Sequence, residues 1–424
     1  MNKVKLGDIG KVSMCKRILK HQTMEKGDIP FFKISTFGGK ANVFISKNVY
    51  EKYRNKFSFP KKGDILISAA GTIGKTVIYD GKPAYFQDSN IVWIENDEKK
   101  VLNRYLYYFY QTKPWQTTNG STITRIYNNN LRDITITFPD ISTQSAITQI
   151  LTSLDDKIEL NNKINKELEN LAKTVYEYWF VQNADKKWEK GKLSDIANIT
   201  MGQSPDGNSY NEQGEGIIFF QGCTDFGSRF PTIRLYTTKP VRFAEAGDIL
   251  LSVRAPVGSI NFSNKKCCIG RGLAALNSKI GSITHLYYIL KDLEMVFNNR
   301  NTNGTTFGAI TKDDLFSLPV TKPPRDILVQ YEKIAKPIFD KQFEIEEESS
   351  TLSQLRDFLL PLLMNGQVTV KAIESKTDII PFKNQENNDQ RFKMWLKNQR
   401  LAARGEIDLQ TLREIFGAMD DDDK

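Results

Sequence analysis

Hydrophobic and polar positions along the chain follow two different periods. Up to Pro139, short β-branched and aromatic runs such as Ile65–Ile67, Thr76–Tyr79 and 134–138 are separated by Gly, Asp, Asn and Pro. This pattern predicts short strands joined by turns. Residues 102–110 read as a helix instead, so we expect a mixed α/β domain.

The spacing of hydrophobic residues changes after Pro139, and again after Pro323 and Pro324. Apolar residues there recur every three or four positions, which predicts two long amphipathic helices. The two stripes are Leu151, Leu154, Ile158, Ile164, Leu168, Leu171, Val175 and Tyr178, and then Ile334, Ile338, Leu352, Leu355, Leu359, Leu362 and Leu363. A helix from about Thr152 to Val181 would be ~45 Å long at ~1.5 Å per residue. Either the stripes bury against each other and form a spacer, or each packs on its own domain.

The chain also repeats itself once, over a long period. Residues 62–68 (KGDILIS) recur as residues 246–252 (AGDILLS), and residues 119–122 (NGST) recur as residues 303–306 (NGTT). Similar offsets join the openings and the ends of the two copies. We therefore expect α/β (α+β) architecture with this division: a first repeated domain at 1–140, helical spacer 1 at 141–186, a second repeated domain at 187–322, helical spacer 2 at 323–370, and a C-terminal tail at 371–424.

Charge follows the same division. The net charge is +9, with +11 in residues 1–140 and +4 in residues 187–322, whereas the intervening and final segments are slightly acidic. Two separate basic blocks suit binding to the phosphates of nucleic acid, although a basic surface also serves solubility. The four cysteines have no CxxC spacing, and no apolar run reaches the ~20 residues of a membrane helix. We expect a cytoplasmic protein with no membrane partner.

Residues 69–76 (AAGTIGKT) end like a phosphate-binding P-loop. The motif fails because Ala69 stands where the first glycine is needed, and because residues 77–79 continue as a strand rather than a helix. The second copy, residues 254–260 (RAPVGSI), lacks the lysine. We interpret the segment as a turn that carries Lys75 or Arg254 outward, either to touch phosphate or to remain solvated.

Residues typical of catalytic sites are scarce. His21 and His285 are the only histidines, and neither stands in a metal-ligand pattern. The Pro323–Pro324 pair lies in KPPR and is not part of an adenine-methyltransferase motif. We therefore expect no catalytic residue, no metal and no cofactor on this chain.

Polar, loop-like segments are the candidates for contacts with DNA, because hydroxyls, amides and guanidinium groups can bond base edges and phosphates. The candidates are Lys33, Lys75, Gln87, Asn119, Ser121, Thr122, Arg125, Arg229, Arg234, Arg254, Arg271, Asn303 and Thr305.

Each copy opens with Leu-x-Asp-Ile, continues with Gly-Asp-Ile-Leu-x-Ser, a glycine turn and Asn-Gly-Ser/Thr-Thr, and ends in a long helix. This order resembles the specificity subunits of type I restriction-modification systems, over about residues 1–370. Residues 359–368 (LLPLLMNGQV) look especially like the end of that family's second helical region. The tail lies outside the resemblance. It has helical character over residues 392–416, and its end, DDDDK, looks like a protease-site tag or is a natural acidic end.

The resemblance implies two target-recognition domains on an antiparallel coiled coil with pseudo-two-fold symmetry. It further implies a non-enzymatic protein that binds double-stranded DNA at a bipartite target, with each domain reading one half. Two methyltransferase subunits would dock on it, with separate restriction and motor subunits, and S-adenosylmethionine, ATP and Mg²⁺ would be used by those partners. The alternatives are a single-chain DNA methyltransferase or nuclease with an unrecognised active site, and a stand-alone DNA-binding regulator.

Overall fold

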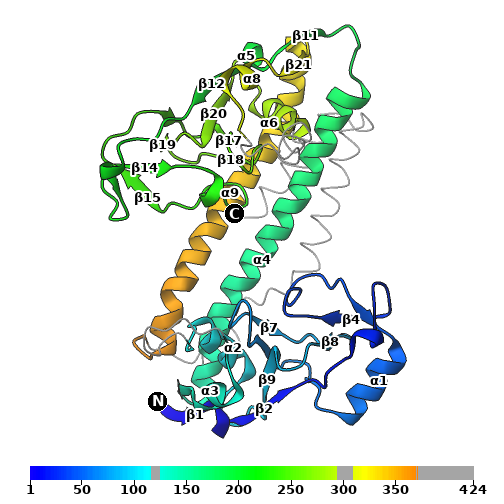
Figure 1. Cartoon of the computed structure of the whole chain (residues 1–424). Coiled ribbons are helices and arrows are strands. Elements are labelled where there is room, and N and C mark those ends of the chain that lie inside the picture. Colours follow the sequence, from blue (N-terminus) through cyan, green and yellow to red (C-terminus); the bar gives the residue numbers. More distant parts are fainter. Residues whose placement is uncertain (116–124, 294–308, 369, 371–424) are drawn as a thin grey trace, which may run out of the picture. The chain divides into compact units, whose positions relative to one another are not determined.

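The computed structural model describes residues 1–115, 125–293, 309–368 and 370 (Figure 1). The chain divides into two compact units. Unit 1 holds residues 1–158 and the described residues from Thr351 onward, and unit 2 holds residues 159–350. Each long helix contributes one part to each unit. In the described part of the chain, no helix is both long and apolar enough to cross a membrane.

Unit 1 is built from short strands and helices. Its strands are β1 (Asn2–Lys5), β2 (Gly10–Met14), β3 (Thr23–Met24), β4 (Ile29–Phe32), β5 (Phe44–Ile45), β6 (Ile65–Ser68), β7 (Thr76–Ile78), β8 (Tyr85–Phe86), β9 (Ile91–Asn96) and β10 (Thr135–Phe138). Its helices are η1 (Leu6–Asp8), η2 (Lys20–Gln22), α1 (Lys47–Lys56), α2 (Asn103–Gln111) and α3 (Asn128–Asp133). The helix expected at residues 102–110 is therefore α2, and the strands expected at 65–67, 76–79 and 134–138 are β6, β7 and β10.

Unit 2 repeats this order. Its strands are β11 (Glu189–Lys192), β12 (Ala197–Met201), β13 (Tyr210–Asn211), β14 (Ile217–Phe220), β15 (Leu235–Thr237), β16 (Phe243–Ala244), β17 (Ile249–Ser252), β18 (Ile260–Phe262), β19 (Cys267–Ile269), β20 (Leu273–Ser278) and β21 (Pro319–Lys322). Its helices are α5 (Leu193–Ile196), η4 (Gly207–Ser209), η5 (Cys223–Asp225), α6 (Ile283–Asp292) and α8 (Lys312–Phe316).

The sheets of the two units have matching topology. The order β2-β9-β6-β7 in unit 1 corresponds to β12-β20-β17-β18 in unit 2, and the pair β1-β10 corresponds to β11-β21. The second sheet is β3-β5-β4-β8 in unit 1 and β13-β15-β14-β19-β16 in unit 2. The internal repeat predicted from the sequence is thus a repeat of the fold, with β16 as an additional edge strand.

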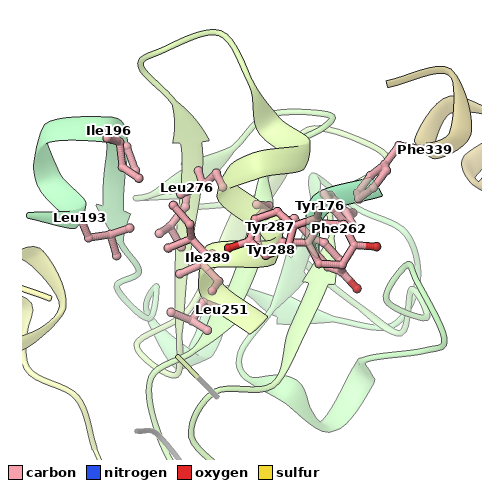
Figure 2. Close-up of a cluster of buried hydrophobic side chains, with 14 of the residues drawn as sticks. Tyr176, Leu193, Ile196, Leu251, Phe262, Leu276, Tyr287, Tyr288, Ile289 and Phe339 are labelled. Atoms are coloured by element: carbon pink, nitrogen blue, oxygen red, sulfur yellow. The ribbon is translucent and has the colours of Figure 1, made fainter. Parts of the chain in front are cut away.

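The repeated GDIL segment shows why each central sheet has two covered faces. Side chains alternate across a strand. Ile65 and Ile67 pack into the core that faces the helices, whereas Leu66 packs into the core that faces the second sheet. Ile249, Leu251 and Leu250 divide in the same way in unit 2. Figure 2 shows Leu251 and Leu276 of the central sheet in one cluster with Tyr287, Tyr288 and Ile289 of α6.

The long helices are α4 (Ile141–Glu177), which continues as the π-helical turn Tyr178–Gln182, and α9 (Arg325–Met364). The first begins about eleven residues earlier than the apolar stripe suggests. Asp140 accounts for this start: its carboxylate accepts hydrogen bonds from the Thr143 backbone N–H at 2.9 Å and from the Ser142 and Thr143 hydroxyls. These bonds cap the helix and hold the pKa of Asp140 well below its usual range.

The helices pair with each other and also pack on the strands. In unit 2, Asn161 bonds Ser349 and Asn165 bonds Glu346; in unit 1, Asp155 bonds Arg356. Partner numbers fall as α4 numbers rise, so the pair is antiparallel. Leu168, Leu171 and Val175 of α4 also join the core of unit 2. The helices therefore pair with each other, and α4 packs on its own domain through Ile147 and Leu151 and on the other domain through its second half. One stripe position departs from the pattern, since Leu355 is 43% exposed.

Candidate nucleic-acid interface

The turn that carries Lys75 and Arg254 is built alike in both units. It joins β6 to β7, and β17 to β18, as an antiparallel hairpin rather than as a strand-to-helix loop. The Gly74 N–H donates to the Ser68 carbonyl, and the Gly258 N–H donates to the Ser252 carbonyl, at 2.9 Å in each case. The hairpin confirms that this segment is not a P-loop.

The backbone of this turn requires glycine. Gly74 has φ of +79° and Gly258 has φ of +92°, a region that other residues rarely adopt. Both Lys75 and Arg254 are exposed, and neither forms an ion pair with any residue that the structure describes. Each unit thus presents an exposed cation on the same glycine turn, Lys75 directly after Gly74 and Arg254 four residues before Gly258, a placement suited to a phosphate.

Arg229 lies in a different environment from the one predicted. Its side chain is only 10% exposed and forms an ion pair with Glu169 of α4 at 2.7 Å. The guanidinium also lies over the rings of Phe262, Phe339 and Phe343 at 5.5–5.8 Å. A cation that is already paired and enclosed by aromatic rings is unavailable to DNA. We assign Arg229 a packing role and remove it from the candidate interface.

Two other arginines are partly engaged within the protein. The Arg125 guanidinium donates to the Ser89 carbonyl at 2.9 Å and lies over the Tyr127 ring. Arg234 pairs with the buried carboxylate of Asp225 at 3.0 Å, while its side chain stays 56% exposed. Arg271 is exposed, and only its backbone N–H is bonded, to the Ser204 hydroxyl. Arg234 and Arg271 therefore keep surface for a ligand.

Lys33 and Gln87 come together in unit 1, although they lie far apart in the sequence. They line one pocket of about 240 Å³ with Arg17, Asp88 and Asn90. The Gln87 amide is held there, because its Oε1 accepts from the Ile34 N–H at 2.9 Å. Arg17, Asp88 and Asn90 were not among the predicted residues. No sequence pattern could have found the pair Arg17 and Asp88, because the two residues lie 71 positions apart.

The remaining candidates, Asn119, Ser121, Thr122, Asn303 and Thr305, lie outside the described residues. Both repeated Asn-Gly segments belong to these residues.

Cys15 and His285 are two titratable side chains that are buried in the structure. Burial raises the pKa of the Cys15 thiol to about 12 and lowers the pKa of His285 to about 3. Cys15 is therefore a thiol and His285 a neutral imidazole at pH 7. Within the described ranges, no group of three or more His, Cys, Asp or Glu side chains is placed to hold a metal ion.

Comparison with known proteins identifies the duplicated fold. The family model for the type I restriction modification DNA specificity domain matches residues 1–170 and again residues 185–352. A putative type I restriction enzyme specificity subunit of Methanocaldococcus jannaschii is 32% identical over 345 residues, covering 73% of this chain and 79% of that protein. The chain belongs to the type I restriction-modification specificity-domain family.

A second relative is more similar over a shorter stretch. A putative type I restriction enzyme specificity subunit of Haemophilus influenzae is 54% identical over 184 residues, or 42% of this chain. The chain spans about half of that relative's length, 47%. The fold of this specificity-domain protein is also similar to the crystal structure of a type I restriction-modification S subunit from M. genitalium. That match has a TM-score of 0.57 at 18% identity and covers 85% of this chain and 95% of the other.

Proposed function

We propose that this specificity-domain protein is the DNA-reading subunit of a type I restriction-modification complex, in which each unit reads one half of a split target. The observation that carries the proposal is the duplicated recognition fold. Each copy presents an exposed cation on the same glycine turn, Lys75 in unit 1 and Arg254 in unit 2.

The long helices would serve as the spacer between the two half-sites. Helix α4 alone has 37 residues, or ~55 Å at ~1.5 Å per residue. Base pairs rise ~3.4 Å along the duplex, so this length corresponds to roughly sixteen base pairs. The ends of the same helices would offer docking positions to two methyltransferase subunits, with restriction subunits completing the complex. The relatives support this assignment through their names, which are those of restriction-enzyme specificity subunits.

The chain itself would be non-catalytic. Methyl transfer with S-adenosylmethionine and DNA cleavage driven by ATP and Mg²⁺ would belong to its partners, in the cytoplasm. The competing hypothesis is that the chain is itself a single-chain DNA methyltransferase or nuclease. Incubating the purified chain with DNA, S-adenosylmethionine, Mg²⁺ and ATP distinguishes the two: methylation or cutting without partner proteins would support the enzyme.

A domain exchange tests the two-half mechanism directly. Residues 1–140 are replaced by the matching domain of another family member, and the sites methylated in the host are mapped by sequencing. We expect a new sequence in one half of the target and an unchanged sequence in the other. Change in both halves would contradict independent reading, and recovery of a methyltransferase with the chain separates a subunit from a lone regulator.

A further inference from the structure

The loop that follows β8 in unit 1 and β19 in unit 2 occupies the same place in the two folds. It leaves the second sheet with matched bonds: the Gln87 N–H donates to the Phe32 carbonyl, and the Gly270 N–H donates to the Phe220 carbonyl. It rejoins the central sheet alike, because Asn90 and Gly272 each accept from the residue that follows the β6 or β17 strand. The frame around this loop is therefore common to both units.

The loop itself differs. Unit 1 has four residues, Gln87 to Asn90, with Ser89 in the left-handed region at φ of +49°. Unit 2 has Gly270, Arg271 and Gly272. A Cβ on either glycine would meet the backbone of Gln221 within 2.7–3.0 Å, so this loop lies flat and presents only Arg271. Two domains that share a backbone frame but recognise different DNA sequences must differ in the residues that contact the bases. This loop is one position where the two units differ.

In unit 1 the loop forms a wall of the 240 Å³ pocket introduced above. We call its seven polar lining residues the polar pocket: Arg17, Lys20, Thr23, Lys33, Gln87, Asp88 and Asn90. It mixes donors with acceptors, as the edge of a base pair does. Its one carboxylate, Asp88, is an acceptor that pairs with Arg17, and an acceptor has a partner on a base edge but none on a phosphate, which only accepts.

Arg17 and Asp88 are arranged for base reading. The Arg17 Nε donates to Asp88 Oδ2 at 2.8 Å, with the carboxylate only 18% exposed and the arginine 68% exposed. A bond through Nε fixes the guanidinium plane and leaves both terminal nitrogens for a ligand. This fork matches the O6 and N7 acceptors of guanine in the major groove.

We propose that the polar pocket is where unit 1 reads bases, and that Arg17, held by Asp88, recognises a guanine in its half of the target. The inference rests on the proposed function and adds the residue and the base to it. Asp88 acts as a positioning residue.

The test is selection from a random pool of 30-base-pair duplexes at ~0.15 M salt, using the full-length chain recovered from its host with any bound subunits. The variants are Arg17→Ala, Arg17→Lys and Asp88→Ala. Lys99→Ala is the matched control, because it removes one exposed charge from a surface ion pair with Asp97 in the same unit. Melting curves establish that each variant is folded.

We expect Arg17→Ala to reduce the preference for guanine at one position of one half-site by about tenfold or more, with the other half unchanged. Arg17→Lys keeps the charge and should lose the same preference, because lysine cannot make the forked contact. Asp88→Ala should weaken the preference at that same position. The Lys99→Ala control should retain the full motif.

If Arg17→Ala lowers recovery of all sequences equally and leaves the motif intact, Arg17 contacts only phosphate and the inference is wrong. If the wild-type chain itself enriches a split motif but no variant changes it, the inference fails while the proposed function stands. If the wild-type chain enriches no sequence, the proposed function fails as well.

Discussion

In each unit, a tyrosine of a short helix contacts an acidic residue of α4, and an arginine pairs with that acid. The arginine comes from a different element in the two units. In unit 1, the Tyr108 hydroxyl of α2 donates to Asp155 of α4, which is also bonded by Arg356 of α9. In unit 2, the Tyr288 hydroxyl of α6 lies at 3.4 Å from Glu169 of α4. There the arginine is Arg229, from the loop before β15.

The burial of the two arginines differs too. Arg356 is 30% exposed, whereas Arg229 is 10% exposed and lies over three phenylalanine rings. The comparison shows that the two units share a tyrosine–acid–arginine chain, in which only the tyrosine of α2 or α6 comes from the equivalent element, because α4 corresponds to α9 in the repeat. It also shows that an arginine in a basic recognition domain can serve packing alone. The predictions below test how far the two units are equivalent, beginning with the largest effect.

Gly74→Ala should destabilise unit 1 by about 3–5 kcal/mol. Beyond the cost of a positive φ, the new Cβ would lie 2.0 Å from the buried Trp115 ring. Gly63→Ala is the matched control, since its φ is +94° but no atom lies within 4 Å of the added Cβ; we expect about 1 kcal/mol. Hydrogen exchange of the β6 and β9 amides measures both variants. Equal losses would mean that Trp115 moves aside easily.

Arg229→Ala should destabilise unit 2 by about 3 kcal/mol, because it leaves Glu169 without its cation and removes the guanidinium from the aromatic cluster. Arg356→Ala in unit 1 should cost about 1 kcal/mol, since the Arg356 side chain is 30% exposed against 10% for Arg229. Urea unfolding, monitored by hydrogen exchange of the amides in each unit, measures the loss of stability caused by each variant. A larger loss for Arg356→Ala would reverse the comparison.

The two units also differ at one core position facing the helices, Tyr105 in unit 1 and His285 in unit 2. The Tyr105 hydroxyl donates to the Thr137 carbonyl, whereas His285 Nδ1 is buried and has no hydrogen-bond partner among the described residues. Burial lowers the pKa of His285 from 6.5 to about 3. The unfolded chain therefore binds a proton at a pH where the folded chain does not, and stability present above pH 6.5 is lost as the pH falls toward 3.

Between pH 7 and pH 5, the lowered pKa of His285 should reduce the free energy of unfolding of unit 2 by about 2 kcal/mol. His285→Phe should remove that part of the pH dependence, whereas Tyr105→Phe in unit 1 should leave its own pH profile unchanged. Unfolding free energies at several pH values, compared between each variant and the wild type, measure it. An identical pH profile for wild type and His285→Phe would show that the imidazole has the same pKa in the folded and the unfolded chain.

Much of this fold was predictable from the sequence, because the GDIL repeat and the apolar stripes record alternation and helical spacing directly. The apolar stripe alone would start α4 about ten residues too late, because the helix begins at one capping residue, Asp140, in a polar stretch with few apolar positions. The site was harder to predict. Arg229 and Lys75 look equally suitable in the sequence, and only tertiary contacts show that one is enclosed and the other exposed. Arg17 and Asp88 come together across 71 positions, a contact that no local pattern records.

The smallest expected effect concerns the equivalent turns. Lys75→Ala and Arg254→Ala should each weaken DNA binding several-fold at low salt, by about 1 kcal/mol, equally for all sequences. Because a phosphate contact releases counterions, each variant should reduce the slope of log K against log salt by ~1. Arg229→Lys is the control, since its cation faces Glu169 rather than solvent and should leave the slope unchanged. Titrations at four salt concentrations measure the slopes. If only one of the two turn variants changes its slope, the equivalence of the turns is structural and does not extend to binding; if neither does, both side chains are solvated.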